Sequence, residues 1–286
     1  MPTVTIEGKQ VKVPIDATIL EAAHRAHVWI PTLCHKAGIE HTAACRICMV
    51  EVWAGSDGPA HSRDPGRLVT ACNYPVRRDI TVDVNGERAS RIRRGVMELL
   101  LARSPESEEL KELATHMGVI GTPFPKVTES QRNCILCGLC VTVCEEVIGA
   151  SAIGFAGRGV DRAVAAPFRQ PSEACIACGA CAAVCPVGTI QVRIHADTAE
   201  AEISPFKSRS KLLVCAECGV RLVSVPVAQA MSDRVGFDWE EFRTLSRLCP
   251  VCRRKHAASS LGVVAAKTGG GKASPNLESI TLKNRA

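Results

Sequence analysis

Aromatic residues are scarce in this chain of 286 residues, which contains six Phe, three Trp and one Tyr. With so few large apolar side chains, one large hydrophobic core is not expected, and the length favours two or three small domains. No run of about 18 apolar residues is present, and the N-terminus lacks a basic segment followed by an apolar one. We therefore expect no membrane span and no signal peptide, and a cytoplasmic location.

Strong positive charge is also missing from most of the chain. The formal net charge is +6, but the segment from Arg253 to Ala286 holds seven Lys or Arg residues and one Glu, which account for all of it. The remaining residues are formally neutral. The charge distribution gives no support to nucleic-acid binding.

Cysteine, in contrast, is abundant, with 16 residues that fall mostly into pairs with two residues between them. Disulfides are typical of secreted proteins, whereas repeated C-x-x-C spacing without a signal peptide favours metal thiolates. Bound metal would then replace part of the missing hydrophobic core.

The first cysteine motif has three residues close together and a fourth from a later segment, in the manner of plant-type 2Fe-2S ferredoxins. Its members are Cys34, Cys45, Cys48 and Cys72. The gap of ten residues after Cys34 is wider than in those ferredoxins. We predict a 2Fe-2S cluster, with structural zinc as the alternative.

Two further motifs have the spacing of bacterial ferredoxins, in which three close cysteines bind one cubane and the fourth binds the other. This spacing predicts two 4Fe-4S clusters rather than zinc or disulfides. The predicted ligands of cluster A are Cys134, Cys137, Cys140 and Cys185, and those of cluster B are Cys144, Cys175, Cys178 and Cys181. Gly138 and Gly179 would let the backbone approach the cluster sulfurs.

The last four cysteines form two C-x-x-C pairs separated by 30 residues, namely Cys215, Cys218, Cys249 and Cys252. Four thiolates suit zinc and a single iron about equally. The C-x-x-C-G and C-P-x-C pairs resemble those of rubredoxin, although Arg253 stands where a glycine usually follows. The sequence leaves zinc and a single iron as alternatives for this site.

The secondary-structure patterns predict an α+β chain. A hairpin is expected around Glu7-Gly8-Lys9, followed by a helix with a capping box at Thr18 and Glu21. Strands are expected at 49–53 and 68–71, with an excursion at 55–67 between them.

A helix is expected from about 89 to 103, and a second one up to Gly118 with Ser104 as its N-cap. The glycine-rich segment from Gly154 to Gly159 is expected to be a loop.

Residues 4 to about 195 resemble one family in the order of their motifs. The runs IPTLCH, CRICMVEV and RRGVMELLLA are similar to those of the large iron–sulfur subunit of respiratory complex I. The diaphorase small subunit of NAD-reducing hydrogenases, and subunits of NAD(P)-linked hydrogenases and formate dehydrogenases, share this pattern. Family members usually carry one more cubane, bound by one His and three Cys. Here Ser104 stands near the position of that His and no cysteine occurs between Cys72 and Cys134, so we expect the electron path to be lengthened or supplied by a partner.

The resemblance implies five regions. They are a β-grasp 2Fe-2S ferredoxin-like domain at 1–88, a helical segment at 89–129, a 2x4Fe-4S ferredoxin domain at 130–205, a rubredoxin-like or zinc-ribbon module at 211–256 and a basic disordered tail at 257–286.

The implied function is electron transfer within a soluble NAD(P)H-linked oxidoreductase, between a flavoprotein subunit and a catalytic subunit for hydrogen, formate or a similar substrate. No catalytic residue is predicted in this chain. The alternatives are an assembly or docking module with a C-terminal zinc ribbon, and a small reductase that acts directly at a cluster.

Overall fold

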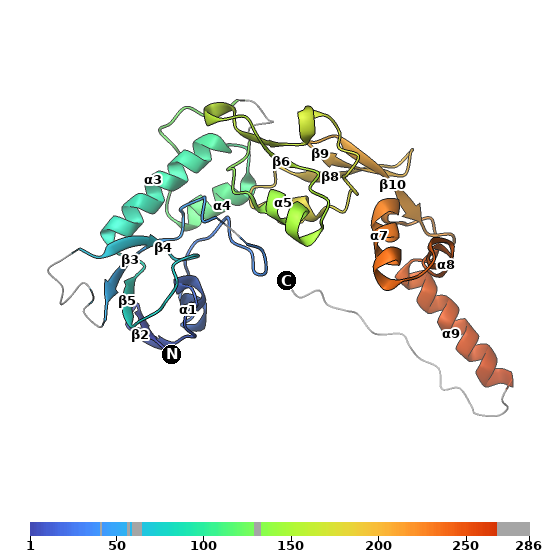
Figure 1. Cartoon of the computed structure of the whole chain (residues 1–286), viewed down its shortest axis with the longest axis horizontal. Coiled ribbons are helices and arrows are strands. Elements are labelled where there is room, and N and C mark those ends of the chain that lie inside the picture. The colour runs from blue at the N-terminus through green and yellow to red at the C-terminus, as the bar shows by residue number, and fades with distance from the viewer. Residues whose placement is uncertain (41, 56–57, 59–64, 129–132, 268–286) are drawn as a thin grey trace. The chain divides into compact units, whose positions relative to one another are not determined.

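The computed structural model describes residues 1–40, 42–55, 58, 65–128 and 133–267, with only the backbone described at 260–267. The chain forms two compact units, one of residues 1–211 with 224–227, and one of residues 212–223 with the described residues from 228 onward (Figure 1). Among the described helices, none is both long enough and apolar enough to cross a bilayer.

A five-stranded sheet with the order β2-β1-β5-β3-β4 opens the first unit. Its strands are β1 (Thr3–Ile6), β2 (Lys9–Lys12), β3 (Met49–Ala54), β4 (Arg67–Thr70) and β5 (Ile80–Asp83). β1 and β5 are parallel, and the other neighbours are antiparallel. The predicted hairpin is confirmed, as are both strands that flank the excursion; most of the excursion lies outside the described residues.

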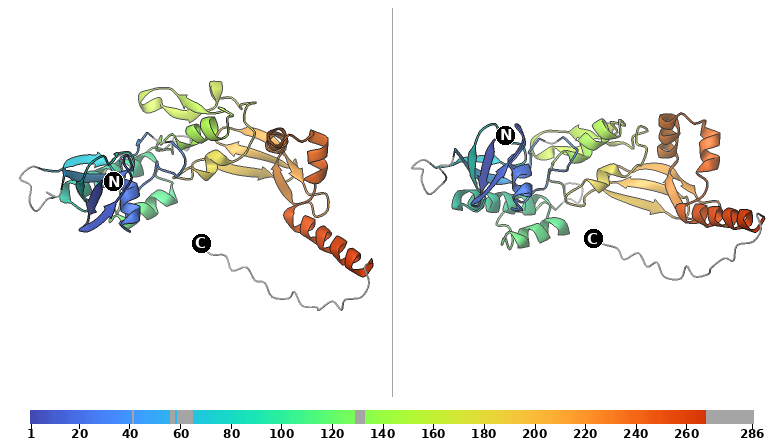
Figure 2. Two further views of the ribbon diagram at one scale, coloured as in Figure 1. Left: turned by 60° about the horizontal axis from the view of Figure 1, so that its bottom comes forward. Right: turned by 90° about the horizontal axis from the view of Figure 1, so that it is seen from below.

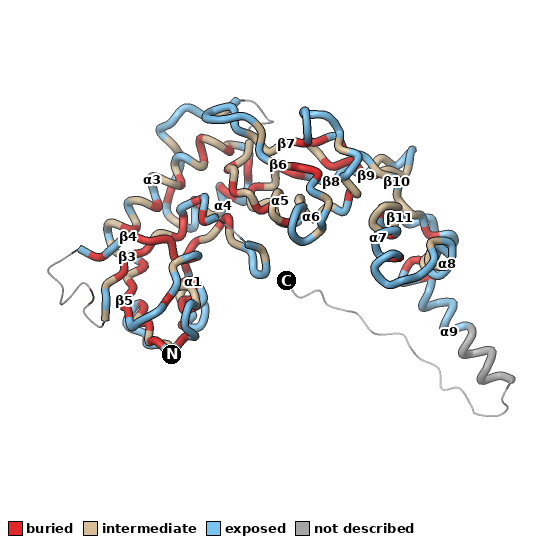
Figure 3. The backbone as a smooth tube through the Cα atoms, in the orientation of Figure 1, coloured by how far each residue is buried: buried red, intermediate tan, exposed pale blue. Residues whose placement is uncertain are grey.

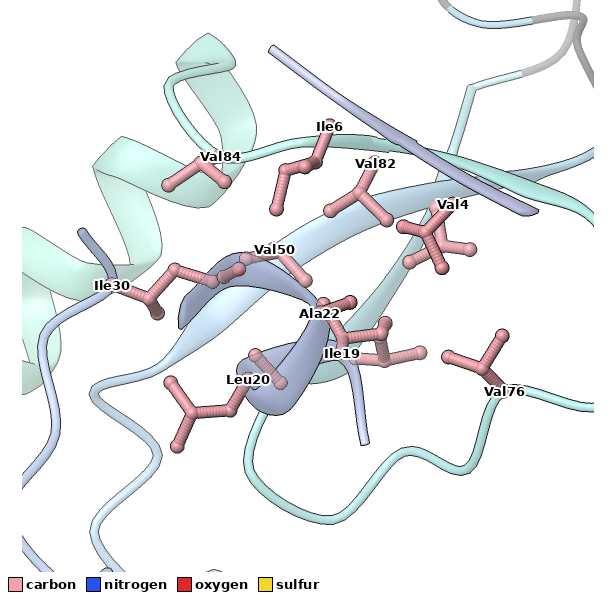
Figure 4. Packing of buried hydrophobic residues seen from close by; sticks show 14 of the residues in the cluster. Val4, Ile6, Ile19, Leu20, Ala22, Ile30, Val50, Val76, Val82 and Val84 are labelled. Carbon is pink, nitrogen blue, oxygen red and sulfur yellow. The ribbon is translucent and has the colours of Figure 1, made fainter. Parts of the chain in front are cut away.

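Helix α1 (Ile19–Arg25) begins at the predicted capping box. The Glu21 amide donates to Thr18 Oγ1 at 3.2 Å, and the Thr18 amide donates to Glu21 Oε2 at 2.7 Å. The helix covers the sheet with its apolar face, and Figure 4 shows its side chains beside those of β1, β3 and β5. The packed residues include Val4, Ile6, Ile19, Leu20, Ala22, Val50 and Val82. Figure 3 shows the buried positions along β3 and β5.

Two helices follow the sheet, α3 (Glu87–Arg103) and α4 (Glu108–His116). The prediction that Ser104 caps the second helix is wrong. Ser104 ends α3, and the N-cap is Ser107, whose hydroxyl accepts from the Leu110 amide at 3.2 Å. The side-chain oxygen of an N-cap residue accepts a hydrogen bond from one of the free amides in the first turn of the helix. Ser104 lies too far upstream of α4 to reach these amides.

The dicluster region is built from short elements. They are α5 (Leu139–Thr142), the π-helix η2 (Val143–Val147), β6 (Gly154–Ala156), the 3-10 turns η3 (Gly159–Asp161) and η4 (Pro167–Arg169), β7 (Ala163–Ala165) and α6 (Ala180–Ala183). The expected glycine-rich loop is only partly a loop, because residues 154–156 pair with β7 as an antiparallel hairpin. Gly157, with φ at +74°, adopts the left-handed backbone needed in its turn.

A four-stranded sheet with the order β11-β10-β9-β8 comes next. Its antiparallel strands β8 (Gln191–His195), β9 (Glu200–Ser204) and β10 (Ser208–Val214) run side by side in Figure 2, and β11 (Arg221–Ser224) pairs with β10. The C-terminal part contains β11, α7 (Val225–Val235), α8 (Trp239–Leu245) and α9 (Pro250–Lys267). The expected disordered tail from 257 is thus helical as far as Lys267, because the alanine-rich run after Cys252 favours helix. Residues 268–286 lie outside the described part.

The mixed helix-and-sheet class is confirmed by these elements.

Candidate metal centres

The first cysteine motif converges at one end of the five-stranded sheet. Cys45 and Cys48 lie in the loop before β3, Cys72 follows β4, and Cys34 comes from the segment after α1. All four side chains are between 1% and 5% exposed. The thiols of Cys45 and Cys72 both hydrogen-bond to Cys34, and Cys72 also hydrogen-bonds to Cys48. One buried group of four sulfurs results.

Contacts between these thiols shift their pKa values in opposite directions. The hydrogen bond to Cys34 and then burial raise the pKa of Cys45 far above the usual range of a thiol. The pKa of Cys72 is raised in the same way by its hydrogen bonds to Cys34 and Cys48 and by burial. The hydrogen bond from Cys72 lowers the pKa of Cys48 to about 7. Four buried thiols in contact cannot all ionise unless a cation compensates their charge. This donor set therefore fits an iron–sulfur cluster, whose irons bind thiolates.

A cavity, here called cavity A, brings four cysteines of the dicluster region together. Cys134, Cys137 and Cys140 come from the segment that leads into α5, and Cys185 follows α6. These are the four residues that the sequence assigned to cluster A. The side chains of Arg103, Arg162 and Phe206 also line the cavity.

A second cavity, here called cavity B, is lined by the other four cysteines of the region. They are Cys144, Cys175, Cys178 and Cys181. The remaining lining is apolar and includes Ile203 and Phe206, so the ring of Phe206 contributes to both cavities.

Backbone conformation explains how each cysteine loop closes on its cavity. Gly138 and Gly179 have φ values of +85° and +76°, a left-handed conformation that glycine adopts without strain. The amide of Leu136 donates to Cys134 Sγ and that of Ala152 to Cys144 Sγ, both at 3.4 Å. Such amide–sulfur hydrogen bonds stabilise thiolates bound to a cluster.

The first motif and cavity A share one buried apolar cluster. Cys34 and Cys45 belong to it together with Cys137, and helices α3 and α4 supply Met97 and Leu110. Burial raises the pKa of Cys137 to about 12, and the nearby Cys34 thiol contributes to this shift. The two cysteine sites are therefore neighbours in the fold.

Ser104, near the expected position of the family's histidine, has a buried hydroxyl without a hydrogen-bond partner among the described residues. Met97 and Leu101 of α3 pack with Leu110 of α4 in the buried apolar cluster that follows the five-stranded sheet.

The last four cysteines lie closest together. The sulfur atoms of Cys215, Cys218, Cys249 and Cys252 all lie within 4.8 Å of one another, and those of Cys218 and Cys249 are 3.7 Å apart. A tetrahedron with metal–sulfur bonds of about 2.3 Å has edges of about 3.8 Å, so this geometry fits one ion.

The two pairs of this quartet have different backbones. Cys215 and Cys218 form a tight turn closed by Gly219, which has φ at +70°. Cys249 instead directly precedes helix α9, and Cys252 lies in the first turn of that helix. Amides of Cys218, Cys249 and Glu217 donate to Cys215 and lower its pKa to about 6. The bond from the Cys249 amide measures 3.3 Å.

Sequence reasoning did not identify Arg103, Arg162, Phe206 or Ser208 as residues of these sites. Arg103 directly follows the RRGVMELLLA run, but the resemblance of that run to the family does not predict a contact between Arg103 and a cysteine. No spacing rule links these residues to cysteines far away in the chain, so only the folded structure places them there.

Comparison with known families agrees with this geometry. Residues 1–87 match the model of the 2Fe-2S iron-sulfur cluster binding domain, and residues 133–189 match that of the 4Fe-4S dicluster domain.

Several proteins are similar to this chain over more than half of its length. The NADPH-Fe(3+) oxidoreductase subunit alpha of Geobacter sulfurreducens is 34% identical over 212 residues, which cover 66% of this chain and 24% of that protein. The NADP-reducing hydrogenase subunit HndD of Solidesulfovibrio fructosivorans is 32% identical over 219 residues, or 66% of this chain and 36% of that protein. The mitochondrial NADH-ubiquinone oxidoreductase 78 kDa subunit of Candida albicans is 30% identical over 182 residues, or 55% of this chain and 24% of that protein.

The chain thus spans between 24% and 36% of the length of these relatives. It contains a 2Fe-2S iron-sulfur cluster binding domain and a 4Fe-4S dicluster domain, and its homologues are subunits of NAD(P)H-linked oxidoreductases and hydrogenases.

Proposed function

We propose that this chain carries electrons between a flavoprotein subunit that handles NAD(P)H and a separate catalytic subunit. The observation that carries this proposal is the continuous packing of three cysteine sites, in which Cys34 and Cys137 share one buried cluster and Phe206 lines both cubane cavities. Neighbouring redox centres in a protein matrix suit electron hopping. The names of the relatives support the choice of partners.

The ligand sets that we propose follow the cysteine groups of the structure. A 2Fe-2S cluster would be held by Cys34, Cys45, Cys48 and Cys72, cluster A by Cys134, Cys137, Cys140 and Cys185, and cluster B by Cys144, Cys175, Cys178 and Cys181. When bound, these three clusters supply one-electron redox centres. The chain's own residues would hold the irons as thiolates and donate backbone amides to sulfur, and burial excludes water from the first quartet.

The proposed spatial order is 2Fe-2S, cluster A, cluster B. Cys34 of the first site and Cys137 of the second share one buried cluster, and the Cys34 thiol contributes to the raised pKa of Cys137. The exchange of Cys185 and Cys144 between the two motifs holds the second pair close.

The C-terminal quartet is proposed to hold structural zinc rather than a redox-active iron. Four thiolates with no open position suit structural zinc and a single iron alike. The choice of zinc follows from the second cysteine pair, which is followed by Arg253 and enters helix α9, whereas a glycine follows the first pair. The buried cluster around the quartet consists of Cys215, Cys249 and Cys252, with Leu222 and Leu248 packed against it. So small a core gains much of its folding free energy from the bound ion.

Metal analysis and EPR spectroscopy of anaerobically purified protein test the proposal. We expect about ten irons and about one zinc per chain, with one 2Fe-2S and two 4Fe-4S signals on reduction. Protein that contained zinc but no iron, and gave no signal on reduction, would contradict an electron-transfer role. Eleven irons without zinc would contradict only the choice of zinc.

A further inference from the structure

The two cubane cavities differ in the charge of their linings. Two arginines, Arg103 and Arg162, line cavity A. Cavity B has no charged side chain among its described lining residues, which are cysteine, apolar residues and glycine. Because reduction adds one negative charge to a cluster, this difference acts directly on the reduction potential.

Arg103 is held in place beside a cluster A ligand. It is the last residue of α3 and is half-buried. Its Nε donates to the carbonyl oxygen of Cys134 at 3.1 Å, and its Nη2 donates to that of Arg162 at 3.3 Å. Both bonds keep the guanidinium at the cavity. Arg162 lies with its Cζ 4.2 Å from the ring centre of Phe155.

Acidic residues near cavity A do not cancel this charge. Glu109 approaches the loop that follows Cys185, at Gly188, but lines neither cavity. The Glu109 carboxylate is exposed and accepts a hydrogen bond from Ser107 Oγ at 2.9 Å. Water and salt screen an exposed charge more than the half-buried guanidinium of Arg103.

Cavity B has a neutral counterpart to Arg103. The buried hydroxyl of Ser208 hydrogen-bonds to the Cys175 thiol, and it also accepts from the Ser172 amide at 3.1 Å. A hydroxyl dipole favours a reduced cluster too. Its effect is smaller than that of a full positive charge, since interactions with ionised groups are roughly twice as strong as neutral ones.

We infer that Arg103 makes cluster A the cubane of higher reduction potential, so that an electron shared by the two cubanes resides mainly on cluster A. This inference rests on the proposed function, because it requires both cubanes. It assigns Arg103 a tuning role toward cluster A, exerted through its charge.

An EPR-monitored redox titration of the anaerobic full-length protein tests the inference. We expect wild type to show two separate cubane transitions. Arg103→Met should lower the ratio of reduced to oxidised cluster A at a fixed potential by at least about tenfold, which is about 59 mV for a one-electron couple. Arg103→Lys, which keeps the charge, should retain most of the wild-type potential.

Two further variants assign the transitions and control for charge. Ser208→Ala should shift the lower transition, that of cluster B, and leave the upper one in place. Arg158→Met removes an equal charge from the exposed turn of the β6–β7 hairpin, where Arg158 lines neither cavity, and should shift neither transition. If Arg103→Met loses cluster A, the exposed Arg162 carries the test: Arg162→Met should lower the same transition by a smaller amount.

Equal potentials for the two cubanes in wild type would overturn the inference, as would charge-removing variants that leave the upper transition unchanged. A shift of equal size in Arg103→Lys would also overturn it, because the effect would then come from the lost hydrogen bonds. These results leave the proposed function intact. Wild-type protein without two cubane signals would instead contradict the proposed function, and the inference with it.

Discussion

The thiols of Cys34 and Cys137, which belong to different cysteine motifs, lie within one buried apolar cluster. Helices α3 and α4 build this cluster with side chains such as Met97 and Leu110, in the region where relatives were expected to carry an additional cubane. Hydrocarbon packing thus joins the 2Fe-2S domain to the dicluster domain. The proposed electron path depends on the integrity of this packing.

Truncation of Met97 should destabilise the junction between the two domains. Met97 is fully buried, so Met97→Ala should lower the free energy of unfolding by about 2–5 kcal/mol, through lost burial and a residual cavity. Leu99→Ala on the same helix is the control, because Leu99 is 53% exposed and should change stability by less than about 0.5 kcal/mol. Urea unfolding followed by circular dichroism measures both variants. Equal losses in the two would contradict the assigned role of the cluster.

Substitution of Cys45 should remove the 2Fe-2S cluster alone. Cys45→Ser deletes one thiolate from a buried quartet in which each sulfur contacts another, and the iron content should fall from about ten to about eight per chain. The cubane signals should persist, because no cysteine of the quartet lines cavity A or B. Thr42→Ala, at an exposed position of the same loop, should keep all three signals. Loss of a cubane signal in Cys45→Ser with the 2Fe-2S signal intact would refute the assignment.

The fourth cysteine of each dicluster motif lines the cavity of the other motif, so its substitution should disrupt the cluster that is more distant in sequence. Cys185→Ala should disrupt cluster A, because Cys185 lines cavity A although it follows the third motif. Cys144→Ala should disrupt cluster B for the corresponding reason. Redox titration of each variant identifies the surviving cubane, which should have the lower potential in Cys185→Ala and the higher one in Cys144→Ala. The reverse outcome would mean either that all four cysteines of each motif bind one cluster, or that cluster B has the higher reduction potential. The double variant Cys144→Ala with Arg103→Met separates these two explanations.

Loss of one thiolate from the C-terminal quartet should unfold that module while leaving the clusters intact. Cys249→Ser should reduce zinc from about one equivalent to near zero and increase protease cleavage after residue 211, because the module has little other core. Ser259→Ala, at an exposed position of the same helix, is the matched control and should retain zinc. A zinc-free module that resists cleavage as well as wild type does would show that the ion is not needed for folding.

Local rules succeeded where neighbours in sequence are also neighbours in space. The capping box of Thr18 and Glu21 and the first hairpin both depend on short spacings. The N-cap of α4 was predicted at Ser104 instead of Ser107 because both serines lie just before an apolar helical stripe. Only the hydrogen bond from the Leu110 amide to the Ser107 hydroxyl distinguishes them. Similarly, the strand at 154–156 depends on its pairing with β7.

Cysteine spacing by itself determined which sulfurs gather, because a short chain of fixed bond lengths limits where three thiolates can reach. Tertiary structure alone decided what surrounds them. It placed Arg103 at Cys134, Ser208 at Cys175 and Cys34 near Cys137, and it placed the last cysteine pair at the start of a helix. These contacts join residues far apart in the chain, and the packing of whole elements, rather than any local preference, fixes the charge and water access at each metal site.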